Sequence, residues 1–170
     1  MPHALKKSKN QHTISLLVAN KPGVLVRIAL VFARRGFNID SLTVSPSFDE
    51  RFSRMTITAQ GDPATLEQII KQAGKRVHVL NAEEYARGEG IEKELSLFKV
   101  RYKPQSKAAI AKLLKKFHAH IIDQADASMI IEQTGTTEEI NTLEASLKTF
   151  GLIELVRTGK VLIARGNEPT

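Results

Sequence analysis

Residues 20–42 read NKPGVLVRIALVFARRGFNIDSL, and this stretch decides how the first half of the chain folds. Pro22 and Gly23 indicate a tight turn, apolar residues recur at helical spacing over residues 24–32, and Gly36 indicates a helix end. The pattern predicts a turn, an amphipathic helix and a second strand. A helix that follows such a turn presents backbone N–H groups without partners, which attract a small anion such as a carboxylate.

Size and composition limit the kind of protein this is. The 170 residues are 42% hydrophobic, which fits a globular protein of one mid-sized domain or two small ones. No apolar run reaches the ~20 residues of a membrane span, and the basic first residues lack the apolar core of a secretory signal. Without cysteine there is no disulfide or thiolate site. We therefore expect an intracellular, cytoplasmic protein with no membrane contact.

The formal net charge of +7 is spread over the chain rather than gathered in one segment. Lys112, Lys115 and Lys116 form a small basic cluster on a predicted helix. Such a cluster is typical of a solvated helix face, and a surface for an acidic partner is the alternative.

Two kinds of periodicity alternate along the chain and predict its elements. The first half shows, in order, strand 12–19, a helix ending at Gly36, strand 37–44, strand 53–59, a helix capped by Asp62 and ended by Gly74, and strand 77–80. The second half shows strand 94–101, helix 108–118, strands 120–123 and 128–132, a helix capped by Thr136 or Thr137, strand 152–156, and a short extra strand at 160–164.

Both halves therefore have the order β-α-β-β-α-β. This order predicts an α+β protein of two ferredoxin-like βαββαβ domains, each an antiparallel sheet with two helices on one face. Gly88 and Gly90 lie among many charges, which is typical of a linker. We place the first domain at residues 11–84, the linker at 85–94 and the second domain at 95–166.

No catalytic motif is evident. There is no cysteine nucleophile, no Gly-x-Ser-x-Gly and no P-loop, and His118 and His120 lack an evident third metal ligand. An acylphosphatase-type enzyme shares the strand order, but Arg27 lies a full turn into an apolar helix rather than just behind a phosphate loop. An RNA-recognition module needs aromatic residues on its open sheet face, and only Phe52 begins a central strand. We expect neither catalysis nor nucleic-acid binding.

The turn before the first helix remains as a candidate ligand site. Backbone N–H groups at residues 23–25 suit a carboxylate, polar side chains on the second strand suit an ammonium group, and apolar neighbours suit an aliphatic side chain. These are the three parts of a free amino acid. The polar candidates are Asn38, Asp40 and Ser41, and the apolar ones are Val24, Leu25 and Ile39. The alternative is structural, in which Gly23 permits close helix packing and Asn20 satisfies the turn backbone.

Longer motifs carry a resemblance to a known family. HTISLLVANKPGVLVRIALVFARRGFNIDSLTV, at residues 12–44, resembles an ACT domain, a βαββαβ amino-acid sensor. RRGFNIDSLTV followed by SRMTI, and later IIDQAD and VRTGKVLIARG, resembles the regulatory small subunit of acetolactate synthase, also called acetohydroxyacid synthase. The resemblance covers residues 11–166. Lys21-Pro22 and residues 102–107 depart from the family pattern.

The resemblance implies a role, partners and a site. Members of this family bind the acetolactate synthase catalytic subunit, activate it and confer valine feedback inhibition in the biosynthesis of valine, isoleucine and leucine. The chain itself would then be no enzyme and hold no cofactor, since thiamine diphosphate, Mg²⁺ and FAD belong to the catalytic subunit. ACT domains pair into homodimers with effector sites at the interface, and the matching positions are Asn20, Gly23, Val24, Leu25, Asn38 and Ile39. A stand-alone amino-acid-binding ACT protein is the alternative.

Overall fold

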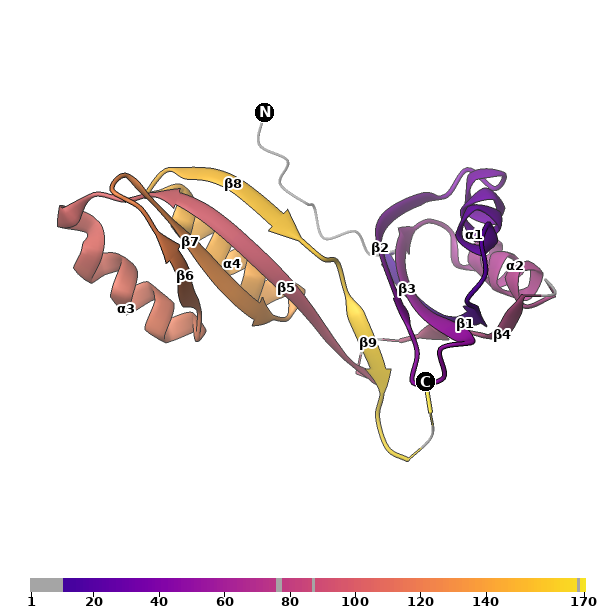
Figure 1. The fold of residues 1–170 in the computed structure, drawn as a ribbon. Coiled ribbons are helices and arrows are strands. Elements are labelled where there is room, and N and C mark those ends of the chain that lie inside the picture. Colours follow the sequence, from indigo (N-terminus) through magenta and orange to yellow (C-terminus); the bar gives the residue numbers. More distant parts are fainter. Residues whose placement is uncertain (1–10, 76–77, 87, 168) are drawn as a thin grey trace. The chain divides into compact units, whose positions relative to one another are not determined.

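Antiparallel sheets and paired helices make up both halves of the chain (Figure 1). The computed structural model describes residues 11–75, 78–86, 88–167 and 169–170. Two compact units are present. The first runs to Ile91 and also includes Lys160–Thr170, and the second is Glu92–Gly159.

The first unit is a four-stranded antiparallel sheet with two helices. Its strands lie in the order β2-β3-β1-β4, and β1 pairs with β3 without interruption from Gln11 opposite Gln60 to Ala19 opposite Phe52. The elements are β1 (Gln11–Ala19), α1 (Val24–Ala33), β2 (Asn38–Pro46), β3 (Phe52–Gln60), α2 (Pro63–Gly74) and β4 (Val79–Tyr85).

The second unit repeats this arrangement, with strands in the order β6-β7-β5-β8. A short extra strand is present near residues 160–164, as predicted. This strand, β9, lies in the segment grouped with the first unit and pairs with β5. The elements are β5 (Gly90–Arg101), the short 3-10 helix η1 (Pro104–Ser106), α3 (Lys107–Phe117), β6 (His120–Gln124), β7 (Ser128–Gly135), α4 (Thr137–Lys148), β8 (Leu152–Arg157) and β9 (Val161–Ala164). The predicted α+β class with two ferredoxin-like units is confirmed.

Each unit has its own apolar core between sheet and helices. In the first, alternate residues of β1 and β3 face α1 and α2. The fully buried residues of this core include Ile14, Leu16 and Val18 on β1, Ile57 on β3, and Leu66 and Ile69 on α2. In the second, the fully buried residues include Phe98, Val100, Ile110, Ile131, Ile140, Leu143 and Leu147. Helix α1 contacts the edge strand β2, whereas α2 contacts the opposite edge strand β4. None of the helices in the described ranges is long and apolar enough to cross a membrane.

The fourth strand and the predicted linker differ from the expected boundaries. Of the expected strand 77–80, Val77 lies outside the described residues, and β4 continues to Tyr85. The segment 85–94 is strand at both ends, because Tyr85 closes β4 and β5 begins at Gly90. Glu83, Glu84 and Glu89 are exposed on these segments, so composition alone indicates a linker there, although Glu94 is buried. The domain limits 11–84 and 95–166 stay predictions.

Helix α4 begins with a reciprocal capping box, one of the two caps that the sequence allows. The Glu139 N–H donates to Oγ1 of Thr136 at 3.3 Å, and the Thr136 N–H donates to Oε2 of Glu139 at 2.7 Å. The hydrogen bonds that Thr136 donates hold the pKa of Glu139 below its ordinary value. The bond from the Thr136 N–H has the largest effect, and the bond from its hydroxyl comes next. Thr136 rather than Thr137 is therefore the N-cap.

We expect Thr136→Ala to lower the free energy of unfolding by about 0.5–2 kcal/mol, because the first turn of α4 loses its side-chain acceptor. Thr136→Ser keeps the hydroxyl and is the matched control, and urea titration followed by circular dichroism measures both variants. Because the pKa of Glu139 is lowered in the folded protein, its ionised carboxylate contributes fully to the free energy of unfolding above the ordinary glutamate pKa of about 4.3. That contribution is lost as the pH falls through the pKa of Glu139 in the folded protein. An Ala variant as stable as the wild type at pH 7 would contradict the cap.

Candidate functional site

The turn between β1 and α1 is anchored to the β2–β3 hairpin by Asn20. The Asn20 backbone N–H donates to the carbonyl of Arg51 at 2.8 Å, and its side-chain Nδ2 donates to the carbonyl of Glu50 at 3.0 Å. Asn20 therefore has the structural role, anchoring the turn, that was the alternative interpretation of the sequence. These two bonds place the turn beside the end of the sheet where β2 finishes and β3 begins.

Gly23 is the N-cap of α1 and has left-handed backbone angles, φ 81° and ψ −7°. A Cβ atom at this position would meet no heavy atom within 4 Å, so the space in front of the turn is open. The first helical bond runs from the Arg27 N–H to the Gly23 carbonyl at 3.1 Å. Among the described residues, the N–H groups of Leu25 and Val26 have no acceptor, and no acidic side chain lies in the first turn. This terminus suits an anion.

Helix α1 has a buried and an exposed apolar face. Val24, only 3% exposed, belongs to the core, whereas Leu25 and Leu30 are 42% and 45% exposed. Val26 is more exposed still. The exposed side chains belong to the helix that contacts β2, the edge strand of the sheet. This edge of the unit therefore combines an unpaired strand with an apolar helix face.

Within one chain, Asn38 and Ile39 lie far from this turn. Asn38 is opposite Gln60, and Gln60 is opposite Gln11, so Asn38 lies at the beginning of β1. The turn follows Ala19, at the other end of β1. Eight residue steps at about 3.3 Å separate these two levels by about 26 Å. A single chain therefore does not bring Asn38 to Gly23, although both are exposed.

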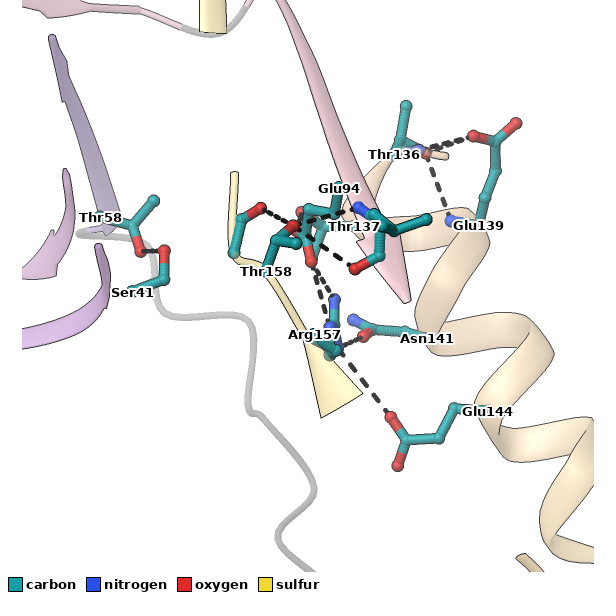
Figure 2. Close-up of polar contacts among 12 residues, drawn as sticks. Ser41, Thr58, Glu94, Thr136, Thr137, Glu139, Asn141, Glu144, Arg157 and Thr158 are labelled. Atoms are coloured by element: carbon teal, nitrogen blue, oxygen red, sulfur yellow. Dashed lines mark hydrogen bonds and ion pairs between the residues drawn. The ribbon is translucent and has the colours of Figure 1, made fainter. Parts of the chain in front are cut away.

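The polar residues at the start of β2 form their own group. Asp40 lies at an irregularity in the β2–β3 pairing, and its carboxylate accepts from Gln60 at 2.9 Å, Gln11 at 3.3 Å and Asn38 at 3.5 Å. The hydroxyl groups of Ser41 and Thr58 are hydrogen-bonded to each other, with their oxygens 2.6 Å apart (Figure 2). Among the described residues no donor reaches Oδ1 of Asn38. Of the three predicted ammonium acceptors, Asn38 is thus the one whose side-chain oxygen accepts no hydrogen bond from the described residues.

Ile39 packs against the apolar core rather than standing free on the surface. Val24 is buried in the same core, so it presents its backbone N–H but little side-chain surface to a ligand. Leu25 is the predicted lining residue that is largely exposed next to the turn.

The histidines supply no metal centre in the described part of the chain. No group of three or more His, Asp or Glu side chains there is arranged so that it could hold a metal ion. The sequence shows no carboxylate near His12, but the structure provides one, because Nδ1 of His12 lies 2.5 Å from Oε1 of Glu84. Nε2 of His12 lies 3.2 Å from the carbonyl oxygen of Gly61. Glu84 is 72 residues away in sequence, so no local pattern indicates the pair.

A buried ion pair in the second unit is a structural feature that sequence reasoning missed (Figure 2). Arg157 donates to Oε2 of Glu94 through Nη2 at 2.7 Å and Nε at 3.1 Å, and through Nη1 to Asn141 at 2.7 Å. The Thr137 hydroxyl donates to the other Glu94 oxygen. Both charges are therefore compensated, and the group joins β5, β8 and α4 rather than forming a ligand site.

Comparison with known proteins agrees with this architecture. A relative from Archaeoglobus fulgidus, named probable acetolactate synthase small subunit, is 42% identical over 158 residues, which cover 93% of this chain and 99% of the relative. The chain belongs to the acetolactate synthase small-subunit family. The family model described as the small subunit of acetolactate synthase matches residues 93–166, and the AHAS small subunit-like ACT domain model matches residues 14–81. The first unit is therefore an ACT domain, as the resemblance implied.

Other members of the family cover nearly the whole chain. The acetolactate synthase small subunit of Mycolicibacterium smegmatis is 39% identical over 91% of this chain and 91% of its own length. The crystal structure of an acetolactate synthase small subunit from Thermotoga maritima matches with a TM-score of 0.84 and 39% identity, over 93% of this chain and 99% of that one. Both units thus have counterparts in this family.

The left-handed conformation of Gly23 can be tested by stability alone. We expect Gly23→Ala to lower the free energy of unfolding by about 1–2 kcal/mol, because the new Cβ has room but the backbone angles disfavour it. Gly23→Asn should cost less, since Asn adopts these angles more readily. Thermal and urea unfolding compare the two variants. Equal losses for Ala and Asn would contradict the conformation described for the turn.

Proposed function

We propose that this chain is a regulatory subunit that binds the acetolactate synthase catalytic subunit, raises its activity and confers feedback inhibition by valine. The relatives are named as small subunits of that enzyme, which supports a catalytic subunit as the partner. The observation that carries the sensing role is the open N-terminus of α1 at Gly23, with no acid in its first turn. Thiamine diphosphate, Mg²⁺ and FAD then belong to the catalytic subunit.

The edge of the ACT domain favours a homodimer through β2. Its sequence, NIDSLTVSP, contains no Lys or Arg and a single acid, whereas the opposite edge strand β4 carries Glu83 and Glu84. Exposed edge strands without such charges are ready to pair with another strand. Leu25 and Leu30 of the adjacent α1 would add apolar contact area. A second copy pairing here extends the sheet and covers this face.

A two-fold dimer explains why the predicted site residues are separated within one chain. When β2 pairs antiparallel with β2 of a second copy, the beginning of one strand lies beside the end of the other. The end of β2 leads into the hairpin that holds Asn20. Asn38 of the partner subunit then approaches the turn at Gly23, and each dimer has two equivalent sites.

Valine fits such a shared site by its three chemical groups. Its carboxylate meets the N–H groups at the start of α1, and its ammonium group meets Oδ1 of Asn38 of the partner subunit. The isopropyl group contacts Leu25. Val24 and Ile39 lie behind it, each in the ACT-domain core of its own chain. Because the ligand bridges two chains, it favours one arrangement of the dimer over others, and this difference in affinity changes the population that activates the catalytic subunit.

Activity measurements test the whole proposal. Adding the purified chain to the catalytic subunit should raise acetolactate production, and valine should lower it again. Gly23→Asp should abolish the valine response, because a carboxylate at the turn repels that of the ligand, while stimulation persists. Gly23→Asn has a similar shape without the charge and should keep part of the response. Absence of stimulation by the wild type would favour a stand-alone amino-acid-binding protein, and a fully valine-sensitive Gly23→Asp variant would exclude the site.

Mixed dimers test whether the site is shared between chains. Asn38→Ala should weaken valine binding by about 1–3 kcal/mol, measured by calorimetry, because the ammonium group loses an acceptor. A dimer of one Gly23→Asp chain and one Asn38→Ala chain, isolated with two affinity tags, contains one doubly altered site and one intact site. It should bind half the wild-type amount of valine at wild-type affinity. If no high-affinity binding returns in the mixed dimer, the site lies within one chain.

A further inference from the structure

The two helices of the second unit form a groove on their outer side. Its volume is about 600 Å³. Its walls come from α3 and from the C-terminal part of α4 with the two residues that follow it, through Ala109, Lys112, Leu113, Lys116, Ser146, Thr149 and Phe150. Leu113 and Phe150 also pack against the core, so the apolar floor is held in place. This volume is within the range of specific binding sites.

The charges at this groove have a single sign. Helix α3 contains four lysines and no acid, and Lys112 and Lys116 have no ion-pair partner among the described residues. Lys116 lies 5.4 Å from the ring centre of Phe117. On the other wall, the Ser146 and Thr149 hydroxyls donate to carbonyls of their own helix, at 2.9 and 2.7 Å. The groove therefore offers an apolar floor and an uncompensated positive rim.

Other features of this unit distinguish the groove from its remaining surface. On the open face of the sheet, Lys99 lies directly opposite Glu154 in the β5–β8 pairing, so charges of both signs are already adjacent there. A second copy of this chain is a poor occupant for the groove, because two-fold packing of α3 on itself brings Lys112 and Lys116 against their own equivalents. The charge pattern favours an acidic occupant.

We propose that the groove between α3 and α4 binds an acidic amphipathic helix of the catalytic subunit. This inference rests on the proposed function, since it names the surface through which the regulatory subunit contacts its enzyme. Apolar residues of the bound helix would contact Leu113 and Phe150, and its Asp or Glu side chains would pair with Lys112 and Lys116. The 11 residues of α3 span about 16 Å, enough to lie along about three turns of such a helix.

Charge reversal in the full-length protein tests this contact. Lys112→Glu/Lys116→Glu should weaken binding to the purified catalytic subunit at least about tenfold, chiefly through slower association, and the difference should shrink at high salt. Lys107→Glu/Lys115→Glu is the matched control, because it changes the same helix by the same charge outside the groove. It should stay within about threefold of the wild type. Surface plasmon resonance gives both rate constants, and circular dichroism shows that the variants fold.

A photo-crosslinker in place of Ala109 identifies the occupant. Crosslinking to an acidic helical peptide of the catalytic subunit supports the proposal, and crosslinking to a second copy of this chain overturns it. Unchanged affinity of the Lys112→Glu/Lys116→Glu variant, or equal losses in the two double variants, also overturns it while leaving the regulatory role intact. If the wild-type chain itself fails to bind the catalytic subunit, the proposed function and the groove proposal fall together.

Discussion

The pairing of β1 with β3 is the constraint on which the first unit depends. Nine consecutive residue pairs, from Gln11 opposite Gln60 to Ala19 opposite Phe52, run without a bulge. A shift by one residue would turn Ile14, Leu16 and Val18 away from the helices, so the buried face fixes the register. The same register decides which loops share an end of the sheet. It places the Gly23 turn beside the β2–β3 hairpin and Asn38 at the opposite end.

This separation has a consequence for how an ACT domain of this kind senses a ligand. A site assembled from both ends of two antiparallel copies cannot exist in the monomer. Ligand binding and dimer formation are then linked, and each strengthens the other by the same free energy. In the proposed dimer, the exposed apolar face of α1 and the lysine-free β2 edge would supply the association on which such a site depends. In the proposed dimer, sensing would therefore be a property of the assembled pair.

The periodic patterns in the sequence predict most of the elements correctly. Residues such as Ile14 and Leu16 on β1, and Ile28 and Phe32 on α1, are buried as their spacing indicates. Gly36 follows the end of α1 and Pro46 is the last residue of β2, close to the predicted ends of these elements, because the backbone preferences of Gly and Pro are local. Local patterns also reveal the open turn at Gly23, which depends only on neighbouring residues.

Contacts between distant parts of the chain were not predictable in this way. The distance of Asn38 from the turn follows from strand register, about which neither segment contains information. The partners Glu94 and Arg157 are 63 residues apart, and although the predicted strand 94–101 includes Glu94, no local pattern indicates that its side chain is buried against Arg157. In the same way β4 extends past Glu83, because an edge strand tolerates charges that look like loop composition.

The pairing of β9 with β5 affects the order in which the protein can fold during synthesis. Leu162 of β9 lies against Gly90, and the Arg165 N–H donates to the Glu89 carbonyl at 3.2 Å. The residues grouped with the first unit thus include a segment that follows the entire second unit. At about 5–20 residues per second, a ribosome needs several seconds to make the intervening segment. Strand β5 therefore gains its β9 partner only after the intervening segment has been made, whereas the β2-β3-β1-β4 sheet of the first unit needs no residue beyond Tyr85.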